Sequence, residues 1–196
     1  MHWPIHLRTV VLFAALTLAS ETAFAKSRTF VVDIGDSTII VKITEDFGNV
    51  SKVRAECVIP RPQKTVWRVL TDYDNLEDVI PIVSESYVLG KEDGTTILRQ
   101  QGRAGLWFLK RDFTVTFRVS EVPMAYVGLE SFEGDFRHFN GAWQIEQRQE
   151  GTWVAHTLEI QPDFFAPRWA IRRVARSIIE ETIESVIRWC LAQEHR

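Results

Sequence analysis

Residues 167–190 read PRWAIRRVARSIIEETIESVIRWC, and their pattern constrains the architecture more than any other part of the chain. Pro167 suits the first turn of a helix, where its missing N–H costs no hydrogen bond. Apolar or weakly polar side chains then recur at intervals of three and four residues, the spacing of one helix face. They are Ile171, Val174, Ala175, Ile178, Ile179, Thr182, Ile183, Val186, Ile187 and Cys190. The sequence therefore predicts one long C-terminal helix with a broad apolar stripe to bury.

Charged side chains on this helix are arranged against the helix dipole. Arginine is concentrated in the first half and glutamate in the second: Arg168, Arg172, Arg173 and Arg176, then Glu180, Glu181 and Glu184. The dipole favours the reverse order. A solvated face is the simplest interpretation, and a partner for the arginines is the alternative.

The sequence before the helix has the pattern of strands joined by tight turns. Six segments alternate with turn-forming clusters, at residues 83–89, 95–103, 110–121, 126–132, 136–147 and 152–161. In the clearest of them, Phe113, Val115 and Phe117 alternate with polar residues, as in a half-buried strand. These segments predict an antiparallel meander.

One strand, two short helices and a hairpin precede the meander. In residues 50–59 apolar and charged side chains alternate, and Pro60 ends the strand because it has no N–H to donate. A short helix begins near Pro62, and a second one ends near Pro81. Residues 26–49 have the pattern of an additional hairpin.

This order of elements predicts an α+β fold. The long helix must bury its stripe, so a twisted antiparallel sheet of six to seven strands is expected to curl around it. The curl leaves a space between helix and sheet, and such clefts bind small ligands. We assign this ligand-binding unit to residues 50–193, with residues 26–49 as a hairpin extension.

The first 25 residues have the pattern of a secretory signal peptide. Arg8 precedes an apolar run at residues 9–19, which is about half the length that a membrane-spanning helix needs. Ala23-Phe24-Ala25 then matches the small-x-small pattern of a cleavage site. We expect residues 1–25 to be removed and the protein to be periplasmic or secreted, with an uncleaved anchor as the alternative.

Composition and cysteine usage narrow the function classes. The formal net charge of −3 disfavours a nucleic-acid binder, which needs a basic surface. Cys57 and Cys190 have no metal-type spacing. An oxidising compartment permits a disulfide between them, and two buried free thiols are the alternative. The sequence contains no nucleophile–base motif, metal-ligand cluster or phosphate loop, so we predict no metal, no cofactor and no catalytic residue.

Residues 62–76, PQKTVWRVLTDYDNL, and residues 80–83, IPIV, carry a family resemblance. They resemble the opening of the polyketide cyclase/dehydrase and coenzyme-Q-binding branch of the START-like (SRPBCC) superfamily. Residues 132–136, FEGDF, and 141–145, GAWQI, are similar to later parts of the same branch. The resemblance implies a helix-grip fold, as in START and Bet v 1 proteins, with a hydrophobic ligand. It implies no particular chemistry, because this fold hosts binders, transporters and cyclases.

Six aromatic or polar residues are candidates for lining the cavity: Tyr87, Arg99, Phe117, Arg137, Trp143 and His156. His156 alternates with apolar residues, and a satisfied core histidine is the alternative interpretation. A buried Arg137 would need an acidic partner or an anionic ligand group, whereas a bulge in its strand would place it in solvent. Arg99 suits an anionic head group, and an outer charged face is the alternative.

A second set is expected at the mouth of the cavity or at a membrane surface: Trp107, Phe108, Phe164, Phe165, Trp169 and Arg172. Large apolar side chains beside cations are typical of membrane interfaces. A cover over the cavity is the alternative.

Three functions fit these expectations. The leading hypothesis is an exported binder or carrier of a lipid or other hydrophobic small molecule, with peripheral membrane contact and no nucleic acid. The second is a polyketide-type aromatase/cyclase or dehydratase, in which His156 would act as acid or base. The third is a protein-interaction module with a filled core. The volume and lining of the space between helix and sheet discriminate among them.

Overall fold

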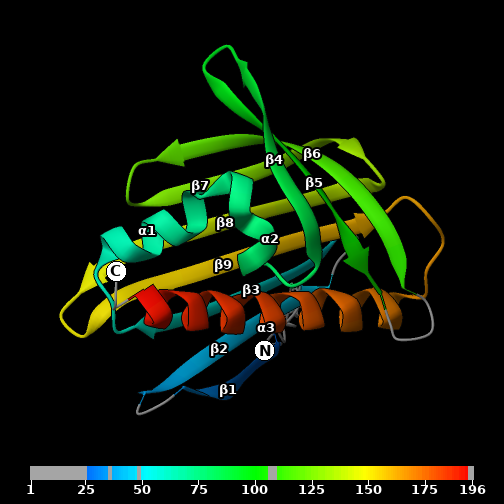
Figure 1. The fold of residues 1–196 in the computed structure, drawn as a ribbon. Helices are drawn as coiled ribbons and strands as arrows, with labels where there is room; N and C mark the ends of the chain where they lie inside the picture. The colour runs from blue at the N-terminus through cyan, green and yellow to red at the C-terminus, as the bar shows by residue number, and fades with distance from the viewer. Residues whose placement is uncertain (1–25, 35–36, 48–49, 106–109, 194–196) are drawn as a thin grey trace, which may run out of the picture.

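The computed structural model describes residues 26–34, 37–47, 50–105 and 110–193. Their nine strands form one antiparallel sheet in the order β1-β2-β3-β9-β8-β7-β6-β5-β4. The long helix α3 crosses one face of this sheet against β3 and β9, and the short helices lie beside it (Figure 1). The strands are β1 (Lys26–Ile34), β2 (Ser37–Phe47), β3 (Ser51–Ile59), β4 (Val83–Glu92), β5 (Thr95–Ala104), β6 (Arg111–Val122), β7 (Tyr126–Gly134), β8 (Phe136–Arg148) and β9 (Gly151–Pro162). The helices are α1 (Gln63–Thr71), the 3-10 turn η1 (Tyr73–Asn75), α2 (Leu76–Val79) and α3 (Arg168–Ala192).

The N-terminal hairpin is part of the sheet, so the prediction of six to seven strands was too low. Strand β2 pairs with both β1 and β3, and Ile43 lies opposite Ala55. Without the hairpin, β3 would be an edge strand with unpaired backbone groups. The local sequence pattern predicts a hairpin, but it carries no signal for the strand against which the hairpin pairs.

From Ala175 to Cys190 the predicted apolar stripe of α3 is buried, which confirms the helix-grip arrangement, while Ile171 and Val174 are half-buried beside the groove described below. Ile179, Ile183 and Ile187 are inaccessible to solvent, as are Val53 and Ala55 on the facing strand β3. Burying an isoleucine side chain is worth about 1.5–3 kcal/mol. The stripe therefore supplies much of the energy that holds the helix to the sheet.

An ion cluster around the buried carboxylate of Glu45 joins the hairpin to the helix. The carboxylate of Glu45 on β2 has no solvent-exposed surface. Arg176 on α3 donates to both of its oxygens, with an Nη2–Oε2 distance of 2.6 Å. Arg28 on β1 lies 3.4 Å from Glu45 Oε1 and also pairs with Glu180 on α3. Arg176, one of the arginines placed against the helix dipole, thus has an acidic partner within the same chain.

The two cysteines are buried free thiols, so the structure takes the second of the two alternatives left open by the sequence. Burial raises the pKa of both Cys57 and Cys190 to about 12, which keeps them protonated at neutral pH. In the part of the chain described, no helix has the length and apolarity to cross a bilayer.

Candidate functional site

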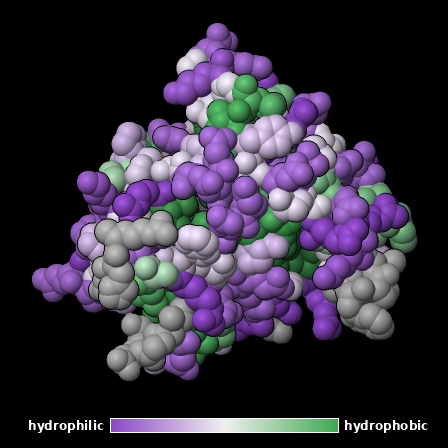
Figure 2. Space-filling view, viewed as in Figure 1, coloured by the Kyte–Doolittle hydropathy of each residue, from purple (hydrophilic) through white to green (hydrophobic). Residues whose placement is uncertain are grey.

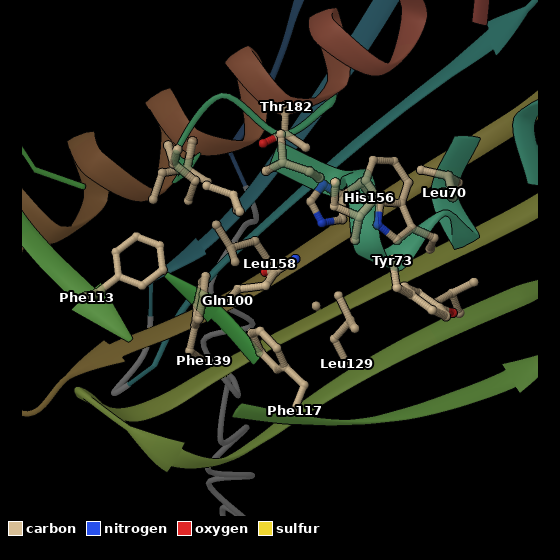
Figure 3. A pocket seen from close by; sticks show the side chains of 18 residues that line it. Leu70, Tyr73, Gln100, Phe113, Phe117, Leu129, Phe139, His156, Leu158 and Thr182 are labelled. Atoms are coloured by element: carbon tan, nitrogen blue, oxygen red, sulfur yellow. The ribbon is translucent and has the colours of Figure 1, made fainter. Parts of the chain in front are cut away.

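A small inner cavity lies between α3 and the sheet. Its volume is about 60 Å³, which is room for a few water-sized groups. Apolar side chains from α1, α2, α3 and five strands form most of the wall (Figure 3). Phe117 on β6 and Phe139 on β8 make contact across the sheet face, with ring centroids 5.7 Å apart. The cavity is the apolar space that the curled sheet was expected to enclose.

His156 on β9 is a polar group in this apolar wall. It is 6% exposed, and its ring stacks on Trp143 of β8 with 3.9 Å between centroids and 6° between planes. The pairing of the two strands places these residues opposite each other. Burial lowers the pKa of His156 from 6.5 to about 3, so the ring is neutral at physiological pH. Its Nδ1 atom is buried and has no hydrogen-bond partner within the described residues.

Two further polar side chains line the same cavity. Gln100 on β5 donates from Nε2 to Ser86 Oγ at 3.3 Å, and Ser86 in turn donates to the Tyr73 carbonyl at 2.6 Å. Thr182 projects from α3, on the other side of the cavity from the sheet (Figure 3). Its hydroxyl is buried without a hydrogen-bond partner among the residues that the structure describes.

A larger groove of about 460 Å³ opens beside the inner cavity. Its wall combines the ends of β5, β6 and β9, the β7–β8 turn, the segment between β9 and α3, and the first turns of α3. Phe113 borders both spaces, and its ring makes edge contacts with Phe136 and Phe139 at 5.6 and 6.2 Å. The phenylalanine cluster therefore stands between the outer groove and the inner cavity.

Of the six predicted cavity residues, the structure brings three together. Phe117, Trp143 and His156 line the inner cavity. Their inward positions follow from the alternation of β6, β8 and β9, which the sequence pattern predicts.

Tyr87, Arg99 and Arg137 lie outside both the cavity and the groove. The register of β5 buries Leu98 and Gln100, so Arg99 faces outward, where it pairs with Glu133 at 3.0 Å. Tyr87 lies opposite Arg99 in the β4–β5 pair and is partly exposed. A register shift between Phe136 and His138 turns Arg137 into solvent, where it pairs with Asp163 at 2.9 Å.

The structure describes four of the six residues that were predicted at the mouth of the cavity. Phe164 and Phe165 line the outer groove, and Phe165 is 95% exposed. The Arg111 guanidinium lies 4.6 Å from the Phe164 ring centroid, a cation–π contact. Trp169 on the first turn of α3 is 60% exposed, and Arg172 is half-buried on the same helix. Trp107 and Phe108 lie outside the described residues. On the face in Figure 2 the surface is largely hydrophilic, with small apolar areas among the polar ones.

As candidates for the cavity, sequence reasoning named none of the other residues that line it, among them Gln100, Gly141 and Thr182. Gln100 occupies an inward position of β5, which only the strand register reveals, whereas Gly141 shares the inward phase of Trp143 on β8. Thr182 had a usable signal, because it is a hydroxyl-bearing residue within an apolar stripe. A polar residue within a buried apolar stripe is a buried polar group, which needs a hydrogen-bond partner.

Comparisons with known proteins agree with this geometry. A family model described as polyketide cyclase/dehydrase and lipid transport matches residues 59–187. The search of curated proteins returned no match. Among solved structures, the protein TTHA0849 from Thermus thermophilus is 24% identical with a TM-score of 0.57, covering 73% of this chain and 99% of that one.

Two other solved structures share the fold at lower identity. A STAR-related lipid transfer protein from Xanthomonas axonopodis is 14% identical with a TM-score of 0.58, covering 83% of this chain and 98% of its own. The Zhui aromatase/cyclase from a Streptomyces species is also 14% identical, with a TM-score of 0.57 and coverage of 74% and 93%.

The curled sheet, the gripped helix and the apolar cavity between them define a START-like, helix-grip fold. The family-model match spans more than half of the chain. This chain belongs to the polyketide cyclase/dehydrase and lipid transport family.

Proposed function

We propose that this protein binds a lipid or another hydrophobic small molecule between α3 and the sheet and carries it. The observation that carries the proposal is an inner cavity with an apolar wall that shares Phe113 with an adjacent groove of about 460 Å³. Ligand pockets of proteins are typically about 300–1,000 Å³ and mostly apolar.

The state of His156 favours binding over cyclase chemistry. A general acid or base works best when its pKa lies near the working pH. With a pKa of about 3, His156 is a neutral imidazole at neutral pH, so it is not the imidazolium that a general acid needs, and it is a weak base. Arg99 and Arg137, two of the other residues that the sequence suggested for the cavity, pair with acidic residues away from it.

Filling the inner cavity is expected to weaken binding. A Cβ added at Gly141 would lie 3.4 Å from Leu129 Cδ1 and 3.9 Å from His156 Nε2, which are ordinary contacts. Gly141→Val would place two further methyl groups in the cavity, so we expect diphenylhexatriene, an apolar fluorescent rod, to bind at least about tenfold more weakly. Fluorescence titration of the purified protein measures this effect.

Gly141→Ala is the matched control, because its single methyl group fits without displacing a neighbour. It should bind diphenylhexatriene nearly as well as the unaltered protein. Circular dichroism establishes that both variants are folded. Equal affinity for the Ala and Val variants, or no binding by the unaltered protein, would count against a ligand in this space.

We also propose that the groove mouth touches membranes during ligand transfer. Phe165 and Trp169 are exposed beside the groove, and aromatic side chains partition into the headgroup region of bilayers. The double variant Phe165→Ser/Trp169→Ser is therefore expected to move diphenylhexatriene between phosphatidylcholine vesicles about tenfold more slowly. Ile40→Ser is the control, because Ile40 is similarly exposed but lies on the hairpin, outside the groove. An equal loss in this control would refute a specific contact.

We further propose that the protein is exported. Residues 1–25 carry the charge, apolar run and Ala-Phe-Ala pattern of a signal peptide. An extracytoplasmic carrier would move ligand between membranes or from a membrane to an acceptor. Amino-terminal sequencing of protein recovered from the periplasm or medium tests this, and a chain that still begins at Met1 would contradict it.

A further inference from the structure

We propose that the inner cavity receives the uncharged polar end of an amphipathic ligand, a hydroxyl or carbonyl oxygen held between Thr182 Oγ1 and His156 Nδ1. The apolar body of the ligand then extends past Phe113 into the outer groove. This inference rests on the proposed function and specifies the ligand class that the same site takes.

The first argument is the pair of unpartnered polar atoms. Thr182 Oγ1 and His156 Nδ1 are both buried without a hydrogen-bond partner among the described residues, and the two residues are 1% and 6% exposed. A buried polar atom that lacks a partner costs about 1–3 kcal/mol. Both residues line one cavity, from α3 on one side and β9 on the other (Figure 3). A single polar group entering between them would satisfy both atoms.

The second argument concerns charge. The side chains that line the inner cavity include no Asp, Glu, Lys or Arg among the described residues. Desolvation keeps His156 neutral, so it offers no cation to a carboxylate or phosphate. Moving an ionised group into such a site without a counter-ion is far more costly than moving a neutral one. The cavity therefore selects against fatty acids and phospholipid head groups at this position.

The third argument is hydrogen-bond complementarity. A threonine hydroxyl both donates and accepts, and a neutral imidazole Nδ1 does one or the other according to its tautomer. A ligand hydroxyl can pair with both side chains in either tautomer. A carbonyl oxygen pairs with both when each of them donates. The size of the inner cavity, about 60 Å³, suits the tip of a molecule and excludes its whole body.

A matched series of twelve-carbon ligands tests this inference by displacement of diphenylhexatriene. At pH 7 we expect 1-dodecanol and 2-dodecanone to bind at least about tenfold more tightly than dodecanoate. Thr182→Val removes the hydroxyl but keeps the shape of the side chain. In this variant the affinity for dodecanol should fall about three- to tenfold relative to the affinity for dodecane. His156→Phe provides a second variant with the same expected direction. Thr96→Val, on β5 and outside the cavity wall, should leave the ratio unchanged.

The outcomes separate the two proposals. If the unaltered protein binds neither diphenylhexatriene nor dodecanol, the proposed function fails and this inference fails with it. If diphenylhexatriene binds but dodecanoate competes as well as dodecanol, only the inference is overturned. An unchanged ratio of dodecanol to dodecane in both Thr182→Val and His156→Phe overturns it as well.

Discussion

Acidification from pH 6.5 toward about pH 4 is expected to destabilise the folded protein strongly because of His156. Burial lowers the folded-state pKa of His156 to about 3, whereas the unfolded chain has the ordinary value of 6.5. Between these values the unfolded state binds a proton that the folded state does not, so stability falls as the pH falls. The slope approaches about 1.4 kcal/mol per pH unit, for a total of up to roughly 5 kcal/mol across the whole interval.

Urea unfolding at a series of pH values measures this effect. His156→Phe keeps an aromatic ring against Trp143 but removes the titrating group, so its stability should depend less on pH between 6.5 and 4. His138→Gln is the matched control, because His138 is half-buried and hydrogen-bonds Glu159 at 3.1 Å away from the cavity. This control should keep the dependence of the unaltered protein. If His156→Phe loses as much stability on acidification as the unaltered protein, the assignment is wrong.

Arg176→Met is expected to lower the free energy of unfolding by about 2–3 kcal/mol, because it removes the main cation partner of a buried carboxylate while Arg176 itself is about one third exposed. The Glu45 carboxylate is fully buried and accepts hydrogen bonds to both oxygens from Arg176. After the substitution only Arg28 remains near it among the described residues, at 3.4 Å. The buried carboxylate would then keep one cation partner in place of two and lose both hydrogen bonds from Arg176.

Two further variants establish the cause. Arg188→Met removes an exposed pair with Glu184 on the same helix and should cost less than about 1 kcal/mol. Adding Glu45→Leu to Arg176→Met removes the stranded carboxylate and should recover much of the lost stability. If Arg176→Met costs no more than Arg188→Met in urea unfolding, the cluster does not hold the hairpin in place.

Only part of the ion cluster can be predicted from the sequence. The reversed charge order of α3 is visible in the sequence and suggests a partner for its arginines. For Arg176 that partner is Glu45, 131 residues earlier, on a strand outside the region that resembles the family. Nothing local to either residue specifies the other, because the pairing depends on how the hairpin joins β3.

The elements and their order follow from local chemistry. Alternation along β6, prolines at helix starts and the three-to-four spacing of α3 predict each segment within a few residues of its observed bounds. These signals are local because backbone hydrogen bonding and side-chain direction repeat with a fixed period in each element. The helix-grip class follows in turn, because a long amphipathic helix and a meander have few ways to cover each other.

Local sequence patterns predict only part of the binding site. Phe117, Trp143 and His156 reach the cavity because each occupies the inward phase of a regular strand. Arg137 does not, because a single register shift in β8 reverses the face on which a side chain lies. Gln100 and Thr182 enter the cavity from β5 and α3, and their meeting with His156 is a property of the assembled fold.

The sequence alone thus determines which segments are strands and which are helices, and that one face of the long helix must be buried. These features arise from contacts between residues that are near neighbours in the chain. The nine-stranded sheet, the Glu45–Arg176 pair and the unsatisfied polar atoms in the cavity appear only when distant segments pack. Register and long-range pairing decide them, and a shift of one residue in a strand would move its side chains to the opposite face.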